Sequence, residues 1–151
     1  MRGAFAVALA LALTMALAGC SRLVVLRDAL SPAEHNDLGV AYEVAGDTVA
    51  AGREYRRALR RDPGFARAMV NLGNLEARRG RWAAAERRYR RALRAMPADP
   101  DALNNLAVVL LRTHRRLEEA EQLARSAAMM AGERDSIPRA TLAEVRAARR
   151  R

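Results

Sequence analysis

The chain contains no lysine, a single cysteine and few aromatic side chains. Aromatic residues make up 4% of the 151 positions, and all 27 basic residues are arginines, set against 17 acids. A lone cysteine excludes an internal disulfide and any zinc site built from several cysteines. Apolar residues form 51% of the chain, mostly alanine and leucine, and they do not alternate with polar residues as in strands. This composition and length predict one all-α domain.

Motifs for catalysis and for nucleic-acid binding are missing as well. His35 and His114 are isolated, and no HExxH pair, glycine-rich phosphate loop or G-x-S-x-G turn occurs. The net charge of +10 is not accompanied by base-reading or base-stacking residues. We therefore expect no enzyme activity, no cofactor, no metal, no nucleic-acid partner and no small-molecule substrate. His35 is interpreted as a packing residue and His114 as an exposed turn residue.

A pattern of small and large residues recurs every 34 positions. Residues 66–99 read as two amphipathic helices joined at Gly80, and shifting this stretch upstream by one period reproduces its small and large positions. Downstream, Leu106 and Ala107 keep the phase, but Ala120 and Ala127 come one residue late. Self-similarity at this period predicts a helical repeat protein, with one extra residue in the third turn near His114.

The second repeat resembles the tetratricopeptide repeat (TPR) family at its defining positions, which are Met69, Leu72, Gly73, Gly80, Trp82, Ala85, Tyr89, Ala92 and Pro97. Departures from the family pattern occur at His35, Glu76, Ala124 and Gly132. The resemblance implies an α-solenoid of three helix-turn-helix repeats, at 32–65, 66–99 and 100–134. A capping helix and basic tail follow at 135–151, because a terminal repeat must present a polar outer face.

Close approach of paired helices explains the pattern. Small residues at facing positions bring helix axes within roughly 8–10 Å, and larger side chains fill the remaining space. The residues expected to pack the repeats are Gly39, Ala51, Tyr55, Ala58, Gly73, Ala85, Tyr89, Ala92, Ala107, Ala120 and Ala127. Helices are expected near 33–45, 49–61, 66–79, 83–95, 100–113 and 117–130, with a last one from 135–138 to about Arg149.

The amino-terminal segment has the form of an export signal. Residues 4–18 are almost uninterruptedly apolar and would span about 22 Å as a helix, short of the ~30 Å hydrocarbon core of a bilayer. This is the length of a signal peptide. The sequence Leu17-Ala18-Gly19-Cys20 resembles the lipobox of bacterial lipoproteins. That resemblance implies removal of residues 1–19, lipidation of Cys20 and a tether at 20–31.

Ser21 follows the cysteine. In Gram-negative lipoproteins, a residue other than aspartate at this place implies transfer to the outer membrane, so the expected address is an outer-membrane anchor facing the periplasm. The alternative interpretation is an ordinary secretory signal with a coincidental cysteine.

In TPR proteins the first helices of the repeats line a concave groove. Asp37, Asn71 and Asn105 fall at one equivalent groove position, and Asn36, Asn74 and Asn104 at neighbouring ones. Asparagine offers both a donor and an acceptor, as an extended peptide backbone does, so these residues are candidates for peptide binding. The alternative is that they satisfy local hydrogen bonds.

Three arginines, Arg67, Arg78 and Arg112, map to the groove or its rim and would favour an acidic segment. The carboxylate clamp of chaperone-binding TPR proteins is largely missing. Asn71 matches it, but Asn36, Val40, Asp101 and Asn105 stand at its other places.

Arginines crowd the second helices of the first two repeats, at Arg53, Arg56, Arg57, Arg60 and Arg61 and again at Arg87, Arg88, Arg90, Arg91 and Arg94. Such runs are usually solvated faces. The alternative is attraction to anionic lipid or cell-wall polymer, which is screened by salt.

The sequence as a whole predicts a lipid-anchored periplasmic adaptor that holds a protein or peptide segment during envelope assembly. It resembles the TPR lipoproteins that support assembly of type IV or tight-adherence (Flp) pili. The alternative function is a structural protein whose arginine-rich outer face holds anionic surfaces.

Overall fold

The computed structural model describes residues 29–131 and 135–150, which form seven helices and no strand. The predicted signal peptide, Cys20 and most of the tether lie outside these residues. The helices are α2 (Pro32–Val44), α3 (Thr48–Arg61), α4 (Ala66–Arg78), α5 (Trp82–Ala95), α6 (Pro100–Arg112), α7 (Leu117–Met130) and α8 (Ile137–Arg149). The six helices expected between residues 33 and 130 begin and end within one residue of their expected bounds.

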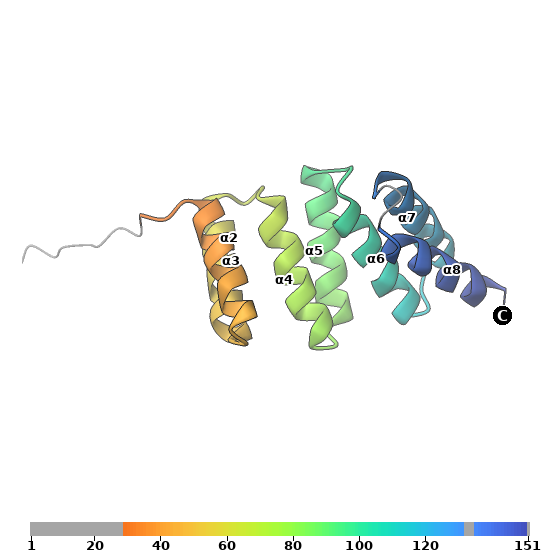
Figure 1. Cartoon of the computed structure of the whole chain (residues 1–151), viewed down its shortest axis with the longest axis horizontal. Helices are drawn as coiled ribbons and strands as arrows, with labels where there is room; N and C mark the ends of the chain where they lie inside the picture. Colours follow the sequence, from red (N-terminus) through yellow and green to blue (C-terminus); the bar gives the residue numbers. More distant parts are fainter. Residues whose placement is uncertain (1–28, 132–134, 151) are drawn as a thin grey trace, which may run out of the picture.

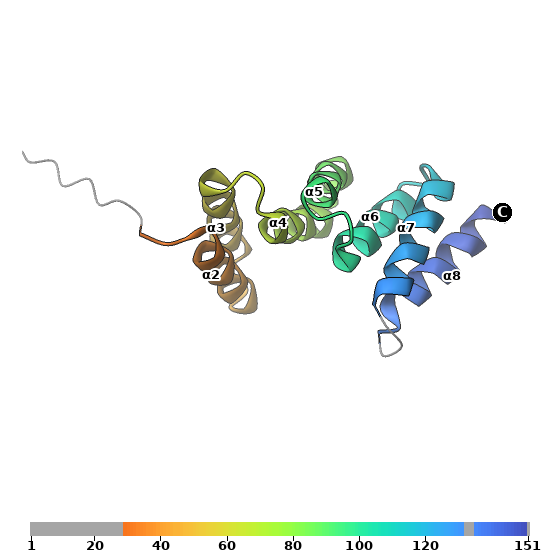
Figure 2. The ribbon, with the colours of Figure 1, turned by 90° about the horizontal axis from the view of Figure 1, so that it is seen from above.

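Three helical hairpins follow one another along the long axis of the molecule, and α8 closes the row (Figures 1 and 2). Each hairpin pairs neighbouring helices, α2 with α3, α4 with α5 and α6 with α7, while α3 meets α4 and α5 meets α6 between hairpins. This arrangement confirms the predicted solenoid of three repeats with a capping helix.

Side-chain caps define where several of the helices begin. Ser31 and Glu34 form a capping box, in which the Ser31 amide donates to Glu34 Oε2 at 2.7 Å and the Glu34 amide to Ser31 Oγ at 3.2 Å. Asp47 accepts from the Ala50 amide at 2.8 Å at the start of α3. Asp99 accepts from the Ala102 amide at 2.8 Å at the start of α6.

The turns within the hairpins explain the shift in phase at the third repeat. Gly46 and Gly80 adopt left-handed backbone with φ of 83° and 70°, as glycine readily does. The third turn, at 113–116, is one residue longer and has no glycine. His114 and Arg116 take the left-handed conformation there, with φ of 49° and 47°.

The core lies inside and between the hairpins, and all of the residues expected to pack the repeats are buried. Gly73 shows why a small residue is required on the first helix. A Cβ added there would lie 2.6 Å from Cε1 of Tyr89, so the tyrosine ring of α5 packs directly on the α4 backbone. Gly39 and Tyr55 meet in the same way in the first repeat.

The capping helix α8 packs on α7 and α6, with Val145 completely buried. Its arginines were expected to form a polar outer face, but two of them bind α7. Arg146 donates to Glu121 Oε1 at 3.1 Å, and Arg149 donates to both Glu121 and Glu118. Among the described residues, no helix combines the length and the apolar character needed to cross a bilayer.

Candidate functional site

A hollow of about 620 Å³ opens on the surface formed by the first helices of the repeats. We call it the inner groove. It lies over α2, α4, the start of α6 and the two connections between hairpins. Its lining residues are Asn36, Asp37, Val40, Phe65, Ala66, Arg67, Val70, Asn71, Met96, Asp99 and Asp101. Val40 and Met96 are 42% and 52% exposed, so the groove offers apolar side chains as well as polar ones.

The charge of the inner groove is opposite in sign to that of the whole chain. Asp37, Asp99 and Asp101 line it, against the single basic residue Arg67. Partial burial raises the pKa of the Asp101 carboxyl, and the neighbouring carboxylates of Asp99 and Asp135 raise it further. The groove therefore holds mutually repelling acids on a chain with a net charge of +10.

Asparagine side chains bond to one another across the boundaries between repeats. Asn71 Nδ2 donates to Asn36 Oδ1 at 2.9 Å, which joins α4 to α2. Asn105 Nδ2 donates to Asn74 Oδ1 at 3.0 Å, which joins α6 to α4. These amides thus hold neighbouring first helices together, which leaves only part of their hydrogen-bonding capacity for a ligand.

Two of the predicted groove asparagines are buried, which corrects the expectation that all of them present their amides to a peptide. Asn36 is 1% exposed and Asn104 is 7% exposed. Asn36 reaches the edge of the inner groove but is occupied by Asn71 and by Asp37, whose Oδ1 accepts at 3.2 Å. Asn104 donates to Asn105 at 3.4 Å. Both side chains are thus largely enclosed by their neighbours, and Asn36 meets the inner groove only at its edge.

The remaining predicted groove residues do not share one cavity. Asn74, Arg78 and Asn105 line a separate hollow of about 290 Å³ between α4 and α6. Arg112 lines another, of about 370 Å³, under α8 beside His114. Arg78 is neutralised by an ion pair with Glu43. Of the three arginines expected to favour an acidic segment, only Arg67 lies in the inner groove.

Tyrosines of the second helices fix the first helices that carry the groove. The Tyr55 hydroxyl donates to Glu43 of α2, and the Tyr89 hydroxyl donates to Asn74 Oδ1 of α4 at 2.7 Å. Burial raises the pKa of both hydroxyls, and the Glu43 carboxylate raises that of Tyr55 further. Each tyrosine thus ties its two helices through both its ring and its hydroxyl.

His35 is completely buried, as expected for a packing residue, but it also belongs to a polar cluster. Its Nδ1 lies 2.8 Å from Glu54 Oε2, and Arg57 donates to Glu54 Oε1 at 2.7 Å. The sequence signal was the departure from an apolar residue at this place in the first repeat. It showed that the position is unusual without revealing Glu54 as the partner on α3.

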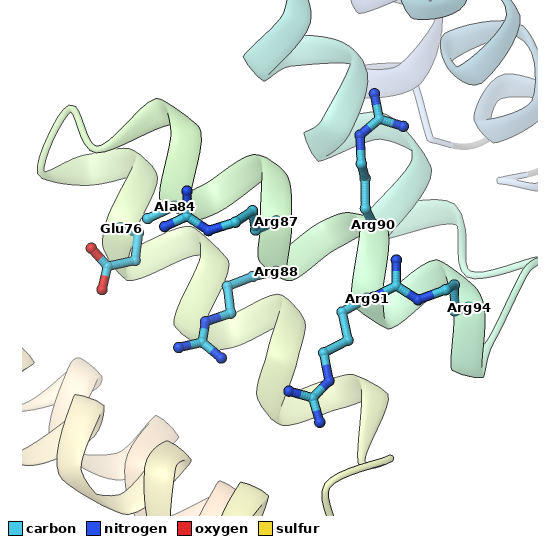
Figure 3. Close-up of a pocket in the computed structure, with 7 residues that line it drawn as sticks. All are labelled: Glu76, Ala84, Arg87, Arg88, Arg90, Arg91 and Arg94. Atoms are coloured by element: carbon cyan, nitrogen blue, oxygen red, sulfur yellow. The ribbon is translucent and has the colours of Figure 1, made fainter.

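A second hollow, of about 420 Å³, lies on the arginine-rich helix α5 (Figure 3). We call it the outer hollow, and its lining residues are Glu76, Ala84, Arg87, Arg88, Arg90, Arg91 and Arg94. Arg90 extends away from Arg88 and Arg91 and forms a two-pronged pair with Glu119, with distances of 2.6 and 2.9 Å. Arg91 donates to the Pro63 carbonyl at 2.8 Å.

Several guanidinium groups of the outer hollow are not neutralised. Within residues 29–131 and 135–150, no ion pair joins Arg87, Arg88 or Arg94 to an acid. Burial lowers the pKa of Arg88, and the nearby charge of Arg91 lowers it further. The Glu76 carboxylate opposes this shift, and Arg56 and Arg87 add smaller lowering effects. The described residues contain no cluster of three or more potential metal ligands.

Comparison with known proteins identifies the architecture. The sequence model of the tetratricopeptide repeat family matches residues 36–86 and 70–136. A similar solved structure is the first TPR of Spaghetti (RPAP3) bound to the HSP90 peptide SRMEEVD. It shares 17% sequence identity with a TM-score of 0.72, covering 80% of this chain and 94% of that one. No curated protein matches the chain. The family match and the three hairpins show that this chain belongs to the tetratricopeptide repeat family.

Proposed function

We propose that the chain is a non-catalytic scaffold that holds an extended segment of another protein in the inner groove. The TPR family generally serves as a scaffold for protein–protein interaction. The observation that carries the proposal is the groove of about 620 Å³, which combines exposed apolar side chains with carboxylates and a partly open asparagine. Interfaces of this kind combine apolar anchors with polar groups that set orientation.

The charge of the groove points to a basic segment, contrary to the acidic one that its arginines suggested. Asp37, Asp99 and Asp101 would attract lysine or arginine side chains, and Val40 and Met96 would contact an apolar neighbour. The HSP90 peptide in the RPAP3 structure carries two consecutive glutamates, and these aspartates would oppose such a sequence. The segment held by this protein is therefore cationic with apolar side chains beside the charges.

We further propose that the scaffold is anchored to the outer membrane through Cys20 and acts in envelope assembly in the periplasm, for example in a pilus or secretion apparatus. The lipobox pattern supports the anchor. Residues 20–31 span at most about 40 Å when fully extended. The first groove helix begins at Pro32, so such an anchor would keep the groove close to the membrane surface.

Site-specific photocrosslinking tests the groove. A photoreactive residue replaces Met96 in the inner groove, or Met129, which is 79% exposed on α7 and lies outside it. We expect one envelope protein to be crosslinked from position 96, through a segment containing lysine or arginine. The D37N/D101N variant should lose that crosslink while it stays folded. Equal crosslinking from position 129, or an acidic crosslinked segment, would contradict the proposal.

Metabolic labelling with a fatty acid tests the anchor separately. The wild-type chain should incorporate the label and fractionate with the outer membrane, and C20S should not incorporate it. An S21A variant is the matched control and should be labelled like the wild type. Retention of the label by C20S would rule out lipidation at this cysteine without affecting the groove.

A further inference from the structure

We propose that the outer hollow on α5 is an anion site that binds a phosphorylated group through Arg87, Arg88 and Arg91. It shares no residue with the inner groove and lies on the second helix of the repeat. The ligand class is a phosphate-bearing anion, either free in solution or in the head group of a lipid. The site is independent of the partner segment proposed for the groove.

The spacing of the arginines gathers them on one face of α5. Positions 87 and 88 follow position 84 by three and four residues, and position 91 follows them by four and three, with position 94 three residues later. Such spacings place all five on one stripe of the helix. Ala84 is the small member of this stripe and leaves room above the helix for the hollow. Like charges at these spacings repel one another and destabilise the helix, which is a cost that a bound anion would offset.

The acids near the outer hollow do not neutralise these arginines. Glu76 is the one carboxylate lining it, and it already accepts from Arg81 at 3.3 Å. Glu86 and Glu119 are engaged by Arg90. Arg88 is half-buried and forms no ion pair within the described residues, although the nearby Glu76 charge acts on it. Partial burial of a charge has a cost, which an opposite charge would offset.

The first repeat has an acid at a position where the outer hollow has an arginine. Shifted by one repeat, Arg88 corresponds to Glu54 and Arg91 to Arg57. In α3 the Glu54 carboxylate accepts from Arg57 at 2.7 Å, so the helix supplies its own anion at this place. In α5 an arginine stands in place of that acid, so position 88 supplies no anion to Arg91.

Phosphate fits this set of donors better than a carboxylate does. Each guanidinium is a planar fork that pairs with two oxygens, and a phosphate group presents three oxygens in different directions to several forks. Arg91 is already oriented by its bond to the Pro63 carbonyl. Arg88 and Arg91 extend to the same side of α5, and Arg87 lies next to Arg88 along the helix (Figure 3). Their long side chains can therefore present several forks to one tetrahedral anion.

Calorimetric titration of the full chain in detergent with inorganic pyrophosphate tests the proposal. We compare the wild type with R88E, which would place an acid at the position that Glu54 occupies in α3. The matched control is R115E, which makes the same charge change in the exposed α6–α7 turn. R88E should weaken pyrophosphate binding at least about tenfold, equivalent to ~1.4 kcal/mol, whereas R115E should leave it within about twofold. R88E should also unfold at a higher temperature than the wild type.

A second arm distinguishes the source of the phosphate. The full chain is placed in nanodiscs of phosphatidylcholine, with or without phosphatidylglycerol, and thermal unfolding is followed. If a lipid head group is the ligand, phosphatidylglycerol should raise the unfolding temperature of the wild type and of R115E but not of R88E. If only free pyrophosphate binds, a soluble phosphorylated ligand is the source. The proposal is overturned if neither probe binds the wild type, or if R88E and R115E lose binding equally.

Discussion

The inner groove and the outer hollow are built from the same repeat but carry opposite charge. The groove gathers Asp37, Asp99 and Asp101 where the first helices meet, and its asparagines bond to one another. The outer hollow gathers arginines on one second helix, and most of them form no ion pair with an acid in the part of the chain that the structure describes. The difference shows that a net charge of +10 says little about a particular surface, because helical phase separates the two kinds of residue.

The substitution with the largest expected effect, at Gly73, should disturb the inner groove and the outer hollow together. In G73A the new methyl group would collide with the Tyr89 ring, since its Cβ would lie 2.6 Å from Cε1. Forcing α4 away from α5 should lower the free energy of unfolding by about 1–3 kcal/mol and weaken both binding activities. Chemical denaturation followed by circular dichroism measures this change.

Gly52 provides the matched control for that substitution. It lies within α3, where an added Cβ would meet Arg56 Nη1 at 3.4 Å, which is an ordinary contact. Alanine is the better helix former, so G52A should be neutral or should stabilise the chain by up to about 1 kcal/mol. Equal destabilisation by G52A and G73A would show that close approach at Gly73 is not what holds the hairpin.

Removing the groove carboxylates should affect only the inner surface. D37N/D101N should weaken binding of a lysine–leucine alternating peptide about tenfold, because two attractive charges are lost at an interface. Pyrophosphate binding should remain unchanged. Fluorescence anisotropy of the labelled peptide measures the first effect, with a glutamate–leucine peptide of equal length as the negative control. Tight binding of that acidic peptide to the wild type would invalidate the assignment of groove charge.

The stability of the capping helix α8 should depend on pH through the titration of Glu121. Hydrogen bonds from Arg149 and Arg146 lower the pKa of this carboxyl, so the folded value lies below the unfolded one. The stabilisation is therefore complete above the unfolded pKa and is lost as the pH falls through the folded pKa. In E121Q, amide hydrogen exchange in α8 should be faster than in the wild type at neutral pH, with the difference vanishing in acid. A difference that persists in acid would refute this origin.

The smallest expected effect on stability comes from Asp101. Its titration should change the stability with pH in the opposite direction to that of Glu121. Burial and the carboxylates of Asp99 and Asp135 raise its pKa, so the folded state binds a proton more readily than the unfolded state. Its cost to stability therefore appears as the pH rises through the unfolded pKa and is complete above the folded value. D101N should be slightly more stable than the wild type at neutral pH and no more stable in acid. Thermal unfolding at several pH values measures the difference.

The repeat pattern was sufficient to predict the fold. The recurrence of Gly39 and Gly73 with Tyr55 and Tyr89 determined the period, and in both repeats the tyrosine ring packs directly on the glycine of the first helix. Ala120 comes one residue later than the repeat period requires, and this shift correctly predicted the longer turn at 113–116. These features are local in sequence and repeat, so periodicity is enough to detect them.

The groove was predicted less completely, because its character depends on contacts across repeats. Nothing local in the sequence shows that Asn71 bonds to Asn36 or that Glu43 neutralises Arg78. Met96 and Asp99 enter the groove from a connection between hairpins, where repeat phase gives no information about direction. Asp99 caps α6, and only the assembled fold shows that the same residue lines the groove with Asp101.

The central claim is that two separate surfaces bind opposite charges, and one calorimetric comparison tests it directly. The wild type, D37N/D101N and R88E are each titrated with the lysine–leucine peptide and with pyrophosphate in separate experiments. The account predicts that D37N/D101N loses the peptide alone and R88E loses pyrophosphate alone. If either variant loses both ligands, or if the wild type binds neither, the assignment of these two surfaces is contradicted.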